Sequence, residues 1–140
     1  MKITLYKHIV RPEFRFDAFN AHYLGFSHLI AYILANEKDC LPEVVHTHDA
    51  ILESKPDLIG ISSVSEMWES TKNTVVWLRK KGFSGPVVIG GSHITALPQT
   101  LPPGADCGVI GQGEETFAEI IRAYRQSRKP HLNEIKGIVY

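Results

Sequence analysis

The chain has 140 residues, 44% of them hydrophobic, with 15 basic and 15 acidic side chains. This length suits one compact domain with a full core and leaves no room for a second. Zero net charge with scattered basic residues argues against nucleic acid and membrane as partners. The distant Cys40 and Cys107, without an apolar signal stretch or membrane-length run, predict free thiols and a cytoplasmic location.

The first third of the chain predicts a strand, a long loop and a helix. Alternation and β-branched residues predict a strand over Lys2–Val10, and Pro12–Gly25 is typical of a loop. The first helix is expected up to Asn36, with Ser27 as its cap. Its apolar residues recur at the helical period: Phe26, Leu29, Ile30, Ile33 and Leu34.

The rest of the chain alternates between short strands and helices. Strands are predicted over 43–48, 58–62, 87–89 and 107–110, and the almost continuous apolar run at 58–62 indicates burial on both faces. Helices are predicted over 50–54 and 66–81 and from Glu114 onward. The Pro-rich connection between the last two strands can hold only a short helix. The last helix has one apolar face, formed by Phe117, Ile120, Ile121 and Tyr124.

Such alternation predicts an α/β fold with right-handed crossovers. The expected architecture is a flavodoxin-like (Rossmann-like) three-layer sandwich with a five-stranded parallel sheet in the order 2-1-3-4-5. Ligands of these folds bind outside the carboxyl ends of the strands, near the point where strand order reverses. The residues predicted there are mostly small: His8, Ser62, Ser63, Gly90, Gly91 and Gly111.

Three common classes of protein with this architecture match the sequence poorly. A phosphorylated receiver domain needs an Asp and a Lys where this chain has Ser62 and Gly111. A flavodoxin needs a compact, glycine-rich phosphate loop after the first strand, whereas this loop is long and aromatic. Gly111-Gln112-Gly113 lacks the third glycine of a dinucleotide fingerprint and follows the last predicted strand instead of the first.

Three motifs in order carry a family resemblance. Gly60-Ile61-Ser62-Ser63-Val64, Val88-Ile89-Gly90-Gly91-Ser92-His93 and Gly111-Gln112-Gly113-Glu114-Glu115-Thr116 together resemble the cobalamin-binding domain at the amino end of cobalamin-dependent radical S-adenosylmethionine proteins. Tyr23-Leu24-Gly25-Phe26 and Ile135–Tyr140 resemble that family's helix entry and connector. Residues 1–128 are therefore expected to form the cobalamin-binding domain, and 129–140 to begin a connector to a catalytic domain outside this sequence.

The resemblance implies that the nucleotide tail of cobalamin enters between strands three and four, with the corrin ring on the carboxyl edge. Glycine there lets the backbone approach a planar base, and serine hydroxyls satisfy the tail's polar atoms. A bulky Gly91→Trp replacement is expected to abolish binding and spare the fold. The implied cofactor-binding residues are Ser62, Ser63, Val64, Gly90, Gly91, Ser92, His93, Gly111, Gln112, Gly113 and Glu114.

Each of these residues also has a structural interpretation. A Gly-Gly pair after a buried strand is often a tight turn, and serines at a strand end often cap the next helix. His93 either touches the tail or is a solvent-exposed loop histidine. Glu114 either contacts the corrin rim or only complements the helix dipole.

A lower cobalt ligand from the protein is not predicted. Some cobalamin-binding proteins carry Asp-x-His-x-x-Gly after the first strand, and here only the fragment His48-Asp49 resembles it. His8, His22 and His28 are weak ligand candidates. A displaced tail base is expected instead, with the lower face of the corrin covered by Phe14, Phe16, His22 or Tyr23. His46 and His48 could share a strand face, but no third ligand completes a zinc site.

The chain lacks the Cys-x-x-x-Cys-x-x-Cys motif that holds the iron-sulfur cluster of radical S-adenosylmethionine enzymes. The resemblance therefore implies a non-catalytic domain that binds cobalamin and presents it to a catalytic domain, in cis or in trans, for methyl transfer or related radical chemistry. The iron-sulfur cluster and S-adenosylmethionine would belong to that other domain. The alternative is a flavodoxin-like regulatory or interaction domain without cobalamin, in which the glycines serve packing alone.

Overall fold

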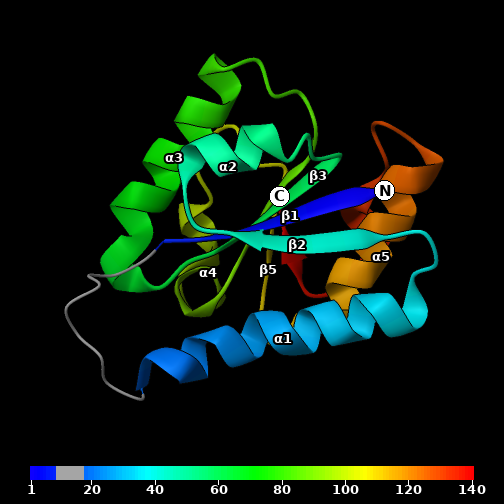
Figure 1. The fold of residues 1–140 in the computed structure, drawn as a ribbon, viewed down its shortest axis with the longest axis horizontal. Helices are drawn as coiled ribbons and strands as arrows, with labels where there is room; N and C mark the ends of the chain where they lie inside the picture. Colours follow the sequence, from blue (N-terminus) through cyan, green and yellow to red (C-terminus); the bar gives the residue numbers. More distant parts are fainter. Residues whose placement is uncertain (9–17) are drawn as a thin grey trace.

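The computed structural model describes residues 1–8 and 18–140, with side chains described outside 9–24. Strands and helices alternate along the chain (Figure 1). Single 3-10 turns lie at Ser65–Met67, Pro98–Thr100 and Leu132–Glu134. The elements in order are β1 (Lys2–Lys7), α1 (Ala18–Asn36), β2 (Leu41–Val45), α2 (His48–Glu53), β3 (Leu58–Ser62), α3 (Trp68–Lys80), β4 (Val87–Gly90), α4 (Ser92–Ala96), β5 (Cys107–Val109), α5 (Glu114–Gln126) and β6 (Ile138–Val139).

The sheet confirms the flavodoxin-like fold and adds one strand to it. Six strands lie in the order β2-β1-β3-β4-β5-β6; the first five are parallel, and β6 pairs antiparallel with β5. The Ile110 amide also donates to the Gly137 carbonyl at 2.8 Å. The last residues of the predicted connector therefore extend the sheet, while the predicted role of 129–140 as a connector stays a prediction.

Helices cover both faces of this sheet, as expected of a three-layer sandwich. Figure 1 shows α1 on one side and α2 and α3 on the other. Alternate strand residues point to opposite faces. Ile3, Leu58 and Val88 pack with α1 and α5 in one buried cluster. Ile59 and Ile89 pack with α2, α3 and α4 in the second cluster.

The first helix is longer than the periodicity predicted. α1 begins at Ala18, so the predicted loop over Pro12–Gly25 is wrong for its last eight residues. Ser27 consequently lies inside the helix and is not its cap. Leu34, expected on the apolar face, is 61% exposed. The prediction therefore placed Phe26 and Ile33 correctly in the core, but it misplaced Leu34 and missed the first two turns.

An ion-pair cluster joins α1 to α5 near the amino-terminal edge of the sheet. Glu37 follows α1, and its side chain is only 4% exposed. Its carboxylate accepts from Arg122 Nε at 2.8 Å and from Arg125 at 3.4 Å, both on α5. This cluster fixes the two helices against each other at the end of α1.

None of the helices in the described ranges has the length and apolar character needed to cross a membrane. The cytoplasmic location stays a prediction.

Candidate functional site

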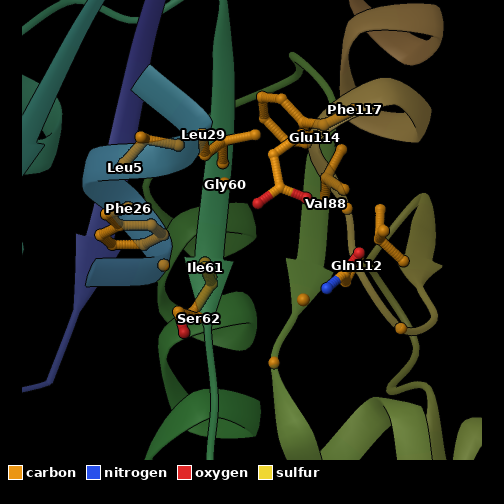
Figure 2. Close-up of a pocket in the computed structure, with 16 residues that line it drawn as sticks. Leu5, Phe26, Leu29, Gly60, Ile61, Ser62, Val88, Gln112, Glu114 and Phe117 are labelled. Atoms are coloured by element: carbon orange, nitrogen blue, oxygen red, sulfur yellow. The ribbon is translucent and has the colours of Figure 1, made fainter. Parts of the chain in front are cut away.

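A cavity of about 290 Å³ lies over β3 and β4, between α1 and the start of α5. It occupies the position that the sequence predicted, toward the carboxyl ends of the central strands. Figure 2 shows Phe26 and Leu29 of α1 on one side and Glu114 and Phe117 of α5 on the other. The lining comprises Leu5, Gly25, Phe26, Leu29, Gly60, Ile61, Ser62, Val88, Gly90, Gly91, Val109, Gly111, Gln112, Gly113, Glu114 and Phe117.

The cavity exists because small residues alternate on one face of two paired strands. Gly60 pairs with Val88, and Ser62 pairs with Gly90, so β3 and β4 leave little side-chain volume beneath α1 and α5. A Cβ added at Gly90 would find no heavy atom within 4 Å. One added at Gly60 would lie 2.8 Å from Leu5 Cδ2 and 3.2 Å from the Phe117 ring. Gly90 thus borders open space, whereas Gly60 forms the packed floor.

Gly91 has a different role from its neighbour. Its φ of +103° favours glycine, and an added Cβ would lie 2.4 Å from the carbonyl oxygen of Ser63. The close approach locks the end of β4 to β3, where the Ser63 amide donates to the Gly90 carbonyl at 2.9 Å. The expectation that Gly91→Trp would spare the fold is therefore wrong, because any side chain at this position meets backbone.

Three polar side chains reach this mostly apolar cavity: Ser62, Gln112 and Glu114. The Glu114 carboxylate points across it toward Gly60 and Val88, and Ser62 lies nearer the carboxyl edge (Figure 2). Other described residues give none of the three side chains a hydrogen-bond or ion-pair partner. They are thus available to a ligand.

Four of the predicted residues do not line the cavity: Ser63, Val64, Ser92 and His93. Ser63 is buried, and its hydroxyl accepts from Thr71 Oγ1 at 2.7 Å. Ser92 is exposed at the first turn of α4, and Val64 precedes the 3-10 turn. These residues therefore lie outside the cavity.

His93 is a buried structural residue. The residue is 6% exposed, and its ring stacks on Trp68 at a centroid distance of 4.0 Å. Its Nδ1 lies 3.0 Å from the Ser65 hydroxyl, and its Nε2 lies 3.2 Å from that of Thr100. The solvent-exposed interpretation is wrong, and this geometry gives no support to a contact with the tail.

His8 and His48 belong to a polar cluster on the other face of the sheet. Thr74 Oγ1 lies 2.9 Å from His48 Nε2 and 3.4 Å from His8 Nε2, and the Tyr6 hydroxyl lies 3.2 Å from His8 Nδ1. Burial, and secondly the neighbouring His48, lowers the pKa of His8. His8 therefore favours its neutral form.

The remaining histidines predicted as metal ligands do not form a metal site in the described part of the chain. His28 is exposed on α1, and neither it nor His8 lines the cavity. His48 begins α2, so it does not share a strand face with His46. No cluster of three metal-ligating side chains occurs among the described residues. Phe14 and Phe16, and the side chains of His22 and Tyr23, lie outside the described part.

A family model described as B12 binding domain matches residues 14–121. The chain belongs to this family. No curated protein matches the sequence. The fold of this B12 binding domain is similar to the crystal structure of the N-terminal domain of the hypothetical protein TM0182 from Thermotoga maritima. The TM-score is 0.57 at 23% identity, covering 87% of this chain and 95% of that one. That similarity supports the fold alone.

The residues of this B12 binding domain fit a flat, largely apolar ligand group. Phe26, Val88 and Phe117 supply apolar surface, and the bare backbone at Gly90 leaves space that a Cβ would fill. Most of the apolar lining was not predicted as ligand-binding residues: Leu5, Phe26, Leu29, Gly60, Val88, Val109 and Phe117. Phe26, Gly60 and Val88 lie within the motifs that carry the family resemblance. The other four show only the apolar pattern that marks ordinary core packing.

Proposed function

We propose that this domain binds cobalamin with the nucleotide tail in the cavity and the corrin ring at the carboxyl edge of the sheet, and presents it to a radical S-adenosylmethionine catalytic domain. The observation that carries the proposal is the open space over Gly90, enclosed by α1 and α5. A cavity with an apolar lining and few polar groups is typical of a small-molecule site.

Each part of the lining has a role in this proposal. Phe26 and Phe117 pack against the tail base, and the Gly90 backbone forms the wall beneath it. The Ser62 hydroxyl donates to a ring nitrogen or accepts from the ribose. Gly111 and Gln112, which are exposed at the rim, face the amides of the corrin. When bound, cobalamin supplies the methyl-transfer or radical chemistry, and the domain supplies binding and orientation.

A tail in the cavity is displaced from cobalt, so the lower face of the corrin is left without its own base. His8 is an unsuitable replacement, because both of its ring nitrogens lie within hydrogen-bond distance of Tyr6 and Thr74. We retain the prediction that loop side chains cover this face. Cob(II)alamin bound to the protein should then lack the nitrogen coupling of the tail base in its electron paramagnetic resonance spectrum.

The proposed catalytic partner would hold the iron-sulfur cluster that this chain has no residues to bind. Cys40 and Cys107 are both buried, and burial raises the pKa of Cys107 to about 12. Neither thiol is suited to hold a cluster, and the sequence has no other cysteine. The resemblance of Ile135–Tyr140 to a connector supports a partner in cis.

Binding through the tail is tested with two corrinoids. Hydroxocobalamin should co-elute with the protein in gel filtration, whereas cobinamide, which lacks the nucleotide tail, should bind at least about tenfold more weakly, a difference of about 1.4 kcal/mol. Absence of co-eluting corrin absorbance contradicts cobalamin binding. Equal retention of the two corrinoids contradicts a tail-binding cavity.

The partner is tested by the coding sequence around this domain. A Cys-x-x-x-Cys-x-x-Cys motif in the same reading frame supports a partner in cis. The same motif in an adjacent reading frame supports a partner in trans, which should form a complex with the cobalamin-loaded domain in gel filtration. If neither frame encodes the motif, the radical S-adenosylmethionine partner is contradicted.

A further inference from the structure

The carboxylate of Glu114 occupies the apolar part of the cavity. It extends from the first residue of α5 toward Gly60 and Val88, next to Phe117 (Figure 2). Described residues provide no hydrogen bond or ion pair to it. Its neighbour Glu115 begins the same helix but is exposed and does not line the cavity. A carboxylate at either position interacts favourably with the helix dipole. The dipole alone therefore does not explain why the Glu114 carboxylate points into the cavity.

A ligand that fills this cavity excludes water from the carboxylate. An ionised carboxyl group in an apolar site is costly unless it accepts hydrogen bonds. The dimethylbenzimidazole base of cobalamin carries no N–H donor when attached to its ribose. An adenine base in the same tail position carries an exocyclic amine, which donates two hydrogens.

We propose that Glu114 is a specificity-determining residue that selects corrinoids whose lower base donates a hydrogen bond. The inference rests on the proposed function, because it assumes that the tail enters this cavity. The carboxylate accepts from an N–H group on the edge of the base, and Phe117 packs beside it. The shape of the cavity admits a flat base, and Glu114 selects among flat bases.

The test compares three corrinoids in their hydroxo forms: the adenine-base analogue, cobalamin and cobinamide. Dissociation constants are measured by absorbance titration for the wild type and for Glu114→Met, Glu114→Gln, Glu115→Met and Glu115→Gln. The wild type should bind the adenine form more tightly than cobalamin. Glu114→Met should reduce this preference by about tenfold to hundredfold, the size of a hydrogen bond to a charged group.

Glu114→Gln keeps the shape of the side chain and should give an intermediate preference, since the amide oxygen still accepts. Both Glu115 variants should keep the wild-type preference, although they remove the same helix-dipole charge. Circular dichroism checks that each variant is folded. The preference of the wild type for the adenine form tests the proposal even if a variant does not fold.

Two outcomes overturn the proposal. One is a wild type that binds the adenine form no more tightly than cobalamin. The other is a Glu114 effect equal for both complete corrinoids, which would place the carboxylate on their shared ribose. These outcomes differ from failure of the proposed function, in which neither complete corrinoid binds more tightly than cobinamide.

Discussion

Two adjacent glycines at the end of β4 separate ligand binding from folding. Gly90 borders open space, whereas Gly91 adopts a positive φ and touches the backbone of Ser63. The sequence motif marked both residues as one wall of a pocket. Both residues border the cavity, but only the geometry shows that Gly91 also holds two strand ends together.

Gly90→Leu should block cobalamin and leave the protein folded. Its side chain enters the space that the tail base would occupy, so affinity should fall at least about tenfold, or about 1.4 kcal/mol. Gly91→Ala is the matched control and should cost about 1–3 kcal/mol of stability through backbone strain. Urea unfolding and corrinoid titration of both variants measure the two effects. Unchanged affinity in Gly90→Leu contradicts the proposed tail position.

His8 makes stability depend on pH. Burial lowers its pKa in the folded state from the ordinary value of 6.5, so the folded protein resists protonation of this ring more than the unfolded chain does. The contribution of His8 to the stability of the folded state is fully present above pH 6.5. It is lost as the pH falls from 6.5 toward the pKa of His8 in the folded protein. Urea midpoints should therefore decline between about pH 7.5 and about pH 5, and His8→Gln should decline less over that range. Parallel declines would show that other groups cause the effect.

At the scale of elements, the α1–α5 pair forms the walls of the cavity, and Glu37 joins the two helices at one end. Glu37→Gln should lower the free energy of unfolding by about 1–3 kcal/mol. The arginines then donate to a neutral amide oxygen, which forms weaker hydrogen bonds than a carboxylate. Arg122→Ala with Arg125→Ala should cost more, since a buried anion then lacks a partner. Thermal unfolding measures both. If the double arginine variant is the more stable one, the carboxylate has another solvating group.

Elements were predictable where their residue patterns differ from those of core packing or loops. The apolar run of β3 and the acidic start of α5 matched their elements directly. The early turns of α1 were missed because the composition of Pro12–Gly25 is typical of a loop, although Phe19 and Tyr23 continue the helical spacing of Phe26. The strand β6 was missed because two residues show no alternation. The rim of the cavity followed from glycines at strand ends, but its apolar walls did not, because Phe26 and Phe117 have the same spacing as core residues.

At the scale of the whole molecule, the last twelve residues pack against the domain. Leu132 is 9% exposed, and Ile135 and Ile138 pack on the cluster beneath α1 and α5. A chain ending at residue 128 should thus lose on the order of 3 kcal/mol of stability. One ending at residue 136, which keeps Leu132 and Ile135, should lose less. Urea unfolding compares both with the full chain. Equal stability of all three would favour the boundary at 128 that the sequence predicted.

Because small and large residues alternate in β3, the cavity forms only when this strand pairs in the correct register. Gly60 and Ser62 face the cavity, while Ile59 and Ile61 pack in the opposite cluster. Ile61 also borders the cavity. A slip of β3 by a single residue would exchange these sets, because strand side chains alternate with a period of two. Two isoleucines would then fill the cavity, and the second cluster would lose them. Correct strand pairing and capacity for a ligand are therefore gained in one folding event.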